Sequence, residues 1–148
     1  MRLAAAGLLL AGVVGTSPKI DPKLGCRTNP ALVEPCFEVE GAVRLWNGTP
    51  SLRLHKRGTN RILGIANGED PIAPKCLTDE AAFEKKIDGR FEVCPFSRDQ
   101  PGHMRMVCVD EVVDARVFDS GAGGRWREVG RLERCRLANP SGARPRTK

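Results

Sequence analysis

Residues 37–45 read FEVEGAVRL, and this stretch decides the fold class. Its apolar side chains alternate with charged ones, which is the period of two expected of a β-strand with one buried face. Gly41 interrupts the alternation on the buried side. A glycine there favours a bulge or a sharp bend, a device that lets a strand coil through a barrel. We therefore expect a curved strand at the start of a β-domain.

Two more strands are expected directly after this one. The tetrapeptide NGTP at 47–50 predicts a turn, because Asn-Gly readily takes positive φ and proline presets its own φ. Residues 52–57 alternate again, this time between leucines and basic or polar residues. The triplet GTN at 58–60 predicts a second turn, and residues 61–66 predict a third short strand. Together the three strands form a meander.

A helix and two further strands complete the expected domain. Residues 78–88 predict a helix: a threonine suits the N-cap, acidic residues follow it, lysines come near its end, and Gly89 suits the position after it. Residues 90–96 predict a fourth strand. A fifth strand is expected from 104 to about 113, or as far as 118.

This order of elements predicts a small five-stranded barrel of the oligonucleotide/oligosaccharide-binding (OB) type, with one helix between strands 3 and 4. We therefore predict a mostly β, OB-like domain over residues 36–118, with an open sheet carrying one helix as the alternative. Residues 16–35 predict an irregular lead-in, and residues 119–148 a basic C-terminal extension. Within it, apolar side chains of 125–137 recur every three residues, as on one side of a short helix, although a glycine weakens that pattern.

The N-terminus has the layout of a signal peptide over residues 1–15. Arg2 supplies a positive charge, and an apolar run without charges follows it. The run is shorter than the roughly 20 residues that a membrane-spanning helix needs. We expect cleavage before Thr16, which would leave no transmembrane span; a buried N-terminal helix is the alternative.

Six cysteines follow the expected signal peptide, and this even number favours disulfides in an oxidising compartment. The sequence therefore predicts an exported protein, periplasmic or extracellular. Six cysteines allow 15 pairings, and only Cys94 with Cys108 can be favoured, since the two are symmetric about a turn centred near Pro101. The predicted disulfide residues are Cys26, Cys36, Cys76, Cys94, Cys108 and Cys135.

Part of the chain resembles a known family. Residues 36–64 contain CFEVEG, NGTPSLRL and GTNRILG, and VCPF at 93–96 and VC at 107–108 follow. This Cys-Phe-x-x-x-Gly, Asn-Gly-Thr-Pro-Ser and Gly-Thr-x-Arg-x-Leu-Gly pattern resembles small exported bacterial proteins of unknown function. The resemblance covers about half of the chain and implies no activity. Residues from 125 onward lie outside it.

The sequence does not favour catalysis, a metal or a cofactor. His55 and His103 are the two histidines, and neither stands in a nucleophile motif. Neighbouring carboxylates such as Asp110 and Glu111 are interpreted as solvated, since nothing in the sequence indicates a cleft around them. No Cys-x-x-Cys or comparable metal-ligand spacing occurs. We predict no catalytic residues, no metal ligands and no cofactor.

The second expected strand carries the most promising ligand surface. Its basic residues and a nearby tryptophan suit an anionic ligand, because cations pair with phosphate or sulfate oxygens and an indole offers a stacking face. An ordinary solvated strand face is the alternative. The predicted binding residues are Trp46, Arg53, His55, Arg57 and Arg61.

The C-terminal extension from 125 to 148 holds eight basic and two acidic residues. It is predicted either to hold polyanions through charge alone or to act only as a solubilising tail. For the whole chain we predict an exported, non-enzymatic binding or accessory module whose partner is an anionic ligand or a protein. The alternatives are a structural or inhibitory protein-interaction module and a small hydrolase that uses His55 or His103.

Overall fold

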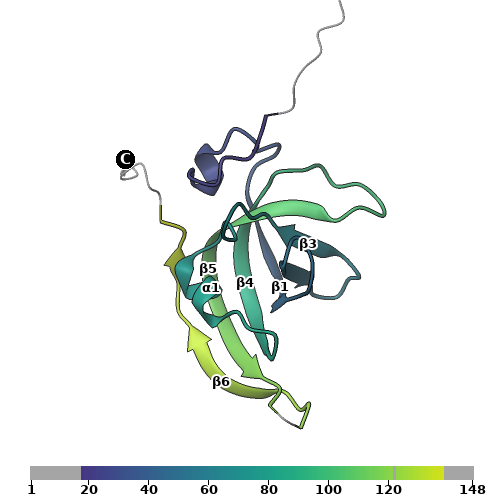
Figure 1. Cartoon of the computed structure of the whole chain (residues 1–148), viewed down its shortest axis with the longest axis vertical. Coiled ribbons are helices and arrows are strands. Elements are labelled where there is room, and N and C mark those ends of the chain that lie inside the picture. Colours follow the sequence, from purple (N-terminus) through teal and green to yellow (C-terminus); the bar gives the residue numbers. More distant parts are fainter. Residues whose placement is uncertain (1–17, 122, 139–148) are drawn as a thin grey trace, which may run out of the picture.

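The computed structural model describes residues 18–121 and 123–138, so the predicted signal peptide lies outside the described residues. Strands form most of the structure, and Figure 1 shows them as one strongly curved sheet. The elements are, in chain order, η1 (Cys26–Thr28), β1 (Phe37–Leu45), β2 (Leu52–Lys56), β3 (Ile62–Ile65), α1 (Lys75–Glu80), β4 (Lys85–Pro95), β5 (Arg105–Asp119), β6 (Arg127–Leu132) and β7 (Cys135–Arg136). The prediction of a mostly β fold is confirmed.

The sheet follows the order β3-β2-β1-β4-β5-β6, and β3 also pairs with β5. The neighbours along this path are antiparallel, whereas the β3–β5 pairing is parallel and closes five strands into a ring. This ring is not a regular barrel. Its closing seam runs only from Leu63 opposite Arg105 to Ile65 opposite Val107, while β4 and β5 pair along almost their whole length with two register shifts.

The helix predicted at 78–88 is wrong. A short helix, α1, does lie between β3 and β4, but it ends at Glu80, and β4 begins at Lys85. The predicted helix would have placed Phe83 and Ile87 on one buried face, yet Phe83 is 54% exposed and Ile87 is 1% exposed within β4. Long-range pairing of β4 with β1 and β5 has overridden the local helix signals.

The inward side chains of the strands form the main hydrophobic core. Val39 and Val43 of β1, and Leu52 and Leu54 of β2, lie inside as the alternation predicts, and Phe91 of β4 packs with them. A second buried cluster lies where the N-terminal segment covers the end of the β4–β5 hairpin. It contains Cys26, Ala31, Ala66, Ile72, Cys94, Phe96 and Cys108.

All six cysteines are paired, as the sequence predicts, but the favoured Cys94–Cys108 disulfide is wrong. The bonds join Cys26 to Cys108, Cys36 to Cys94 and Cys76 to Cys135. Cys94 and Cys108 do oppose each other in the β4–β5 register. Each instead bonds a cysteine of the N-terminal segment that packs over them. Three disulfides suggest an oxidising environment for the folded chain.

The C-terminal part of the chain extends the sheet. Residues 125–137, whose spacing suggested a short helix, instead form β6 and β7, and both strands pair with β5 (Figure 1). Nearly all of β6 is exposed, so pairing with β5 rather than burial holds it in place. The Cys76–Cys135 disulfide links β7 to α1. In the described residues no helix is long and apolar enough to span a membrane.

Gly41 is required by a close approach of two strands rather than by a bulge. A Cβ at Gly41 would lie 2.2 Å from the carbonyl oxygen of His55. Gly89, its register partner on β4, has an equally close neighbour in the carbonyl oxygen of Asp114, at 2.1 Å from an added Cβ. The β1–β4 register is continuous through Gly41, and the register shifts lie instead between β4 and β5 and between β5 and β6.

Candidate functional site

The outer face of the sheet carries a row of basic residues that crosses neighbouring strands. Arg44 of β1 is the register partner of both Arg53 on β2 and Lys86 on β4. Lys86 in turn opposes Phe118 on β5. These positions alternate with buried ones, so their side chains lie on the side away from the core. Four strands thus present one continuous line of side chains.

Aromatic rings lie between these cations. The guanidinium carbon of Arg44 is 5.2 Å from the ring centre of Trp46 and 5.2 Å from that of Trp126. The Lys86 ammonium is 5.1 Å from Trp126 and 4.8 Å from Phe118, and Arg116 lies 5.6 Å from Phe118. These are cation–π distances. We call Trp46, Arg44, Trp126, Lys86 and Phe118 the aromatic–cation ladder; Arg116 lies beside its Phe118 end and pairs with Glu128 at 3.7 Å.

Arg53 and His55 of β2 lie at the Trp46 end of the ladder. The imidazole of His55 stacks on the indole of Trp46, with ring centres 5.4 Å apart and an interplanar angle of 22°. The Arg53 guanidinium lies 5.8 Å from Trp46, and its Nε donates a hydrogen bond to the carbonyl oxygen of Pro50 at 3.1 Å. Trp46 is therefore surrounded by three basic side chains.

The electrostatics at this end of the ladder are strongly positive. Burial, and then repulsion from Arg44 and Arg53, lowers the pKa of His55 below its ordinary value. The neutral form of His55 is therefore more favoured than in an ordinary histidine. A carboxylate base beside His55, which the hydrolase hypothesis would need, is not among the groups that shift its pKa.

Several polar groups of the ladder, and of Arg53 and His55 at its Trp46 end, have no partner among the described residues. Within residues 18–121 and 123–138, the side chains of Arg44, Arg53 and Lys86 form no ion pair with a carboxylate. Three buried atoms here, Arg44 Nε, Trp46 Nε1 and His55 Nε2, have no hydrogen-bond partner. Leaving a buried polar atom unsatisfied costs about 1–3 kcal/mol. The cluster therefore carries a cost that no group of the described residues relieves.

Two of the predicted binding residues do not join this cluster. Arg57 pairs with Glu40 at 3.2 Å and also with Asp88, and Arg61 pairs with Asp99. Their charges are balanced within the protein. The structure thus brings together Trp46, Arg53 and His55 of the predicted set and places Arg57 and Arg61 outside it.

Sequence reasoning missed Arg44, Lys86 and Trp126. Arg44 is an outward residue of the first predicted strand, so its alternation was a usable signal. Lys86 was assigned to the end of a helix that does not form, and Trp126 to an extension outside the predicted barrel. Only the observed register brings these three side chains together.

The remaining predicted reactive groups have structural partners. His103 lies in an exposed turn, where its Nδ1 is 3.2 Å from the carbonyl oxygen of Pro101. Glu111, interpreted from the sequence as solvated, is 3% exposed and pairs with Arg134 and Arg136. These two arginines of the predicted basic extension therefore hold the β7 segment against β5.

One group of potential metal ligands occurs in the described residues, but it cannot bind metal through thiolates. Ligand atoms of Cys26, Cys94 and Asp110 lie within 4.8 Å of one another. Both cysteines are in disulfides, and the Asp110 carboxylate accepts a hydrogen bond from Arg27 at 2.9 Å. Disulfide sulfur lacks the charge that makes thiolate a metal ligand.

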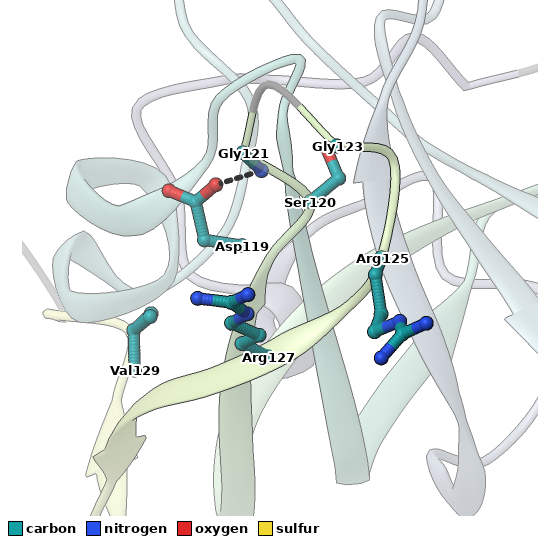
Figure 2. Close-up of a pocket in the computed structure, with 7 residues that line it drawn as sticks. All are labelled: Asp119, Ser120, Gly121, Gly123, Arg125, Arg127 and Val129. Atoms are coloured by element: carbon teal, nitrogen blue, oxygen red, sulfur yellow. Dashed lines mark hydrogen bonds between the residues drawn. The ribbon is translucent and has the colours of Figure 1, made fainter.

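A pocket of about 270 Å³ lies at the turn between β5 and β6 (Figure 2). Arg125 and Arg127 line it, and Asp119 accepts a 2.7 Å hydrogen bond from the backbone N–H of Gly121. The Asp119 carboxylate is therefore used to close the turn. Because this turn includes residue 122, which lies outside the described residues, we assign no site to the pocket.

We compared the chain with protein families, with curated proteins and with solved structures, and none of them matched. The resemblance of residues 36–64 to small exported bacterial proteins therefore stays a prediction. The function must be argued from the geometry of this chain alone.

Proposed function

We propose that the protein is an exported, non-enzymatic binding module that holds an anionic ligand on the aromatic–cation ladder and on Arg53 and His55. One observation carries this proposal. Among the described residues, Arg44, Arg53 and Lys86 have no carboxylate partner, and three buried polar atoms beside them have no hydrogen-bond partner. Oxygens of an anion would supply the missing charge partners of these three cations.

The order of the strands supports an OB-like description of the domain. The ring β1-β2-β3-β5-β4, with the short α1 between β3 and β4, is compatible with a five-stranded Greek-key barrel of that type. Ligands of such barrels commonly lie on the face of strands 2 and 3. In this chain the proposed surface begins on β2 and continues over β1, β4 and β5, away from β3.

Export is the second part of the proposal. The apolar run of 1–15 has the layout of a signal peptide, and the three disulfides suit an oxidising compartment. An extracytoplasmic protein with a fixed row of cations would meet anionic molecules of the cell envelope or its surroundings. A binding role needs no acid–base pair at His55.

The protein reports on this site through its own fluorescence, since Trp46 and Trp126 are its two tryptophans and both belong to the ladder. We would titrate the wild-type protein with inorganic phosphate, inorganic sulfate and polygalacturonate, and follow the emission. We expect a saturable change with at least one of them, which is lost in an Arg44→Gln, Arg53→Gln double variant.

The matched control is Arg57→Gln, which removes an outer-face arginine of the same sheet that is already paired. It should bind as the wild type does. Absence of any anion-dependent change, or an equal loss of binding in the Arg57→Gln control, would refute the proposed function.

A further inference from the structure

We infer that the ligand is an acidic polysaccharide whose chain crosses the strands along the ladder; this inference rests on the proposed function and specifies its ligand class. The first argument is the length of the cationic row. Arg53, Arg44 and Lys86 are register partners on three adjacent strands, and Phe118 continues the row on a fourth. Neighbouring strands are about 4.8 Å apart, so the three cations span roughly 10 Å and the row as far as Phe118 roughly 14 Å. A single small anion cannot contact all of it, whereas a chain with repeated negative charges can.

The second argument is that the aromatic rings are already covered. Trp46 is in contact with His55, Arg44 and Arg53, and Trp126 with Arg44 and Lys86. Single-stranded nucleic acid is held largely by bases stacked on free aromatic faces. Here the rings hold the cations in place instead, which reduces the entropy lost when these flexible side chains bind a ligand. The ladder is thus suited to recognise charge, and nucleic acid is not favoured.

The third argument is that the ladder lies on inner strands of the sheet. β1 pairs with β2 and β4 on its two sides, and β4 pairs with β1 and β5. No backbone edge is open at these strands, so an acidic peptide could not add to the sheet there as a further strand. The ligand must be recognised by side chains across the strand direction.

The fourth argument is the surface that borders the ladder. Ala42, Asp88 and Arg116 occupy the next outer row on β1, β4 and β5. The Asp88 carboxylate pairs with Arg57, which also pairs with Glu40. Arg116 pairs with Glu128 at 3.7 Å, so within the described residues this row offers an anionic chain only cations that already have carboxylate partners. The unpaired cations of the ladder therefore direct such a chain along it, and the acidic groups it carries could be carboxylate, sulfate or phosphate.

The test measures how affinity depends on ligand length and on salt. Galacturonate, galacturonate oligomers of increasing length and oligothymidylates of matched charge would be titrated by tryptophan fluorescence at several salt concentrations. We expect the oligomers to bind at least about tenfold more tightly than the monomer, because several sites are engaged by one molecule. Sulfated and phosphorylated oligosaccharides of the same length would then show which acidic group is preferred.

Variants assign the effect to the row. Lys86→Met should weaken oligomer binding and make the salt dependence shallower, by up to about 0.7 in the slope of log K against log salt for one lost cation. It should weaken monomer binding less, because a monomer contacts fewer cations of the row. The control is Arg90→Met. Arg90 lies on β4 like Lys86, but it is paired with Glu38 of β1, so its removal should change neither the oligomer affinity nor the salt dependence.

Each outcome decides between the proposals. Equal affinity for monomer and oligomers would overturn the polysaccharide inference and leave the proposed anion site intact. Tighter binding of oligothymidylate than of the oligogalacturonate of equal charge would overturn it in favour of nucleic acid. No binding of any anion would reject the proposed function itself.

Discussion

Arg57 and Arg44 lie on the outer side of the same sheet, but Arg57 contacts carboxylates whereas Arg44 contacts aromatic rings. The Arg57 guanidinium pairs with the carboxylates of Glu40 and Asp88. The Arg44 guanidinium lies against the indoles of Trp46 and Trp126 and has no carboxylate partner among the described residues. A carboxylate neutralises a cation, whereas an aromatic ring positions it and leaves its net charge in place. Arg57 therefore stabilises the sheet, and Arg44 remains available to a ligand.

The same contrast divides the whole outer face into two regions. The paired region contains alternating charges, such as Arg90 with Glu38 at 3.5 Å and Arg131 with Asp114 at 3.0 Å. The ladder region contains cations and rings. Net charge alone does not find a binding surface here, because the basic residues of both regions contribute equally to it. What distinguishes the ladder is the absence of partners for its cations within the described chain.

The largest expected effect is a loss of stability from a substitution at Gly89. This residue lies on β4, the strand that carries side chains of both regions. In Gly89→Ala the new Cβ would lie 2.1 Å from the carbonyl oxygen of Asp114 and 2.5 Å from the Cα of Ala115. Backbone atoms cannot move aside cheaply, so we expect a loss of stability of about 3 kcal/mol or more in urea unfolding. Gly123→Ala, whose Cβ would meet nothing within 4 Å, is the control and should change stability by less than about 0.5 kcal/mol. Wild-type stability in Gly89→Ala would show that the strand register is wrong.

Charge reversal should then separate the two regions. Lys86→Glu places a carboxylate beside Arg44 and in the path of the ligand, so we expect anion affinity to fall by about 100-fold. Arg90→Glu reverses a charge on the same strand in the paired region, and affinity should change by less than about threefold. Affinities would be measured by fluorescence titration at fixed ionic strength. Equal losses in the two variants would mean that only net charge matters.

Stability should respond in the reverse sense. Arg57→Met removes two ion pairs, but its side chain is 52% exposed, so the expected cost is only about 0.5–1 kcal/mol. Lys86→Met keeps an apolar stem against Trp126 and Phe118 and removes a charge that has no partner, so stability should be unchanged or slightly higher. Thermal and urea unfolding of both variants would check this. A larger loss of stability in Lys86→Met than in Arg57→Met would mean that the ladder stabilises the fold rather than binding a ligand.

The smallest effect is a pH dependence from His55. Burial and the two neighbouring arginines lower its pKa in the folded state, so between that pKa and the ordinary value of about 6.5 the unfolded chain binds more protons. Stability should therefore fall as pH drops through this window, and anion binding should strengthen because a protonated His55 adds a positive charge. In His55→Gln both trends should be reduced. We would measure them by urea unfolding and fluorescence titration between pH 4.5 and 7.5; identical profiles in wild type and variant would remove His55 from the site.

Local sequence signals were sufficient for β1, β2 and β3 and insufficient for the first half of β4 and for β6 and β7. The alternation in residues 37–45 and 52–57 placed Val39, Val43 and Leu54 inside correctly. The helix signals of 78–88 were equally regular, yet the end of this segment forms part of β4, which pairs with β1 and β5, strands that are distant in the sequence. The cysteine symmetry about Pro101 found a true cross-strand pair but could not anticipate the competing cysteines of the N-terminal segment.

The site shows the same limit. Trp46, Arg53 and His55 were predicted because they are neighbours on one strand and its preceding turn. Whether an arginine is free or paired depends on residues that are distant in the sequence. Asp88 lies 31 positions from Arg57 and was not visible as its partner until the β1–β4 register was known. The same β1–β4 register places Arg44 next to Lys86 and so makes both part of the site.

The most direct test of the central claim compares the guanidinium groups of Arg44 and Arg57 by NMR. The Nε–H signals of both arginines and the two indole N–H signals would be followed during titration with a galacturonate oligomer. We expect the signals of Arg44, Trp46 and Trp126 to shift together with one saturation curve, while that of Arg57 stays in place. A shift confined to Arg57, or equal shifts of all arginines, would contradict the claim that the ladder is the binding surface.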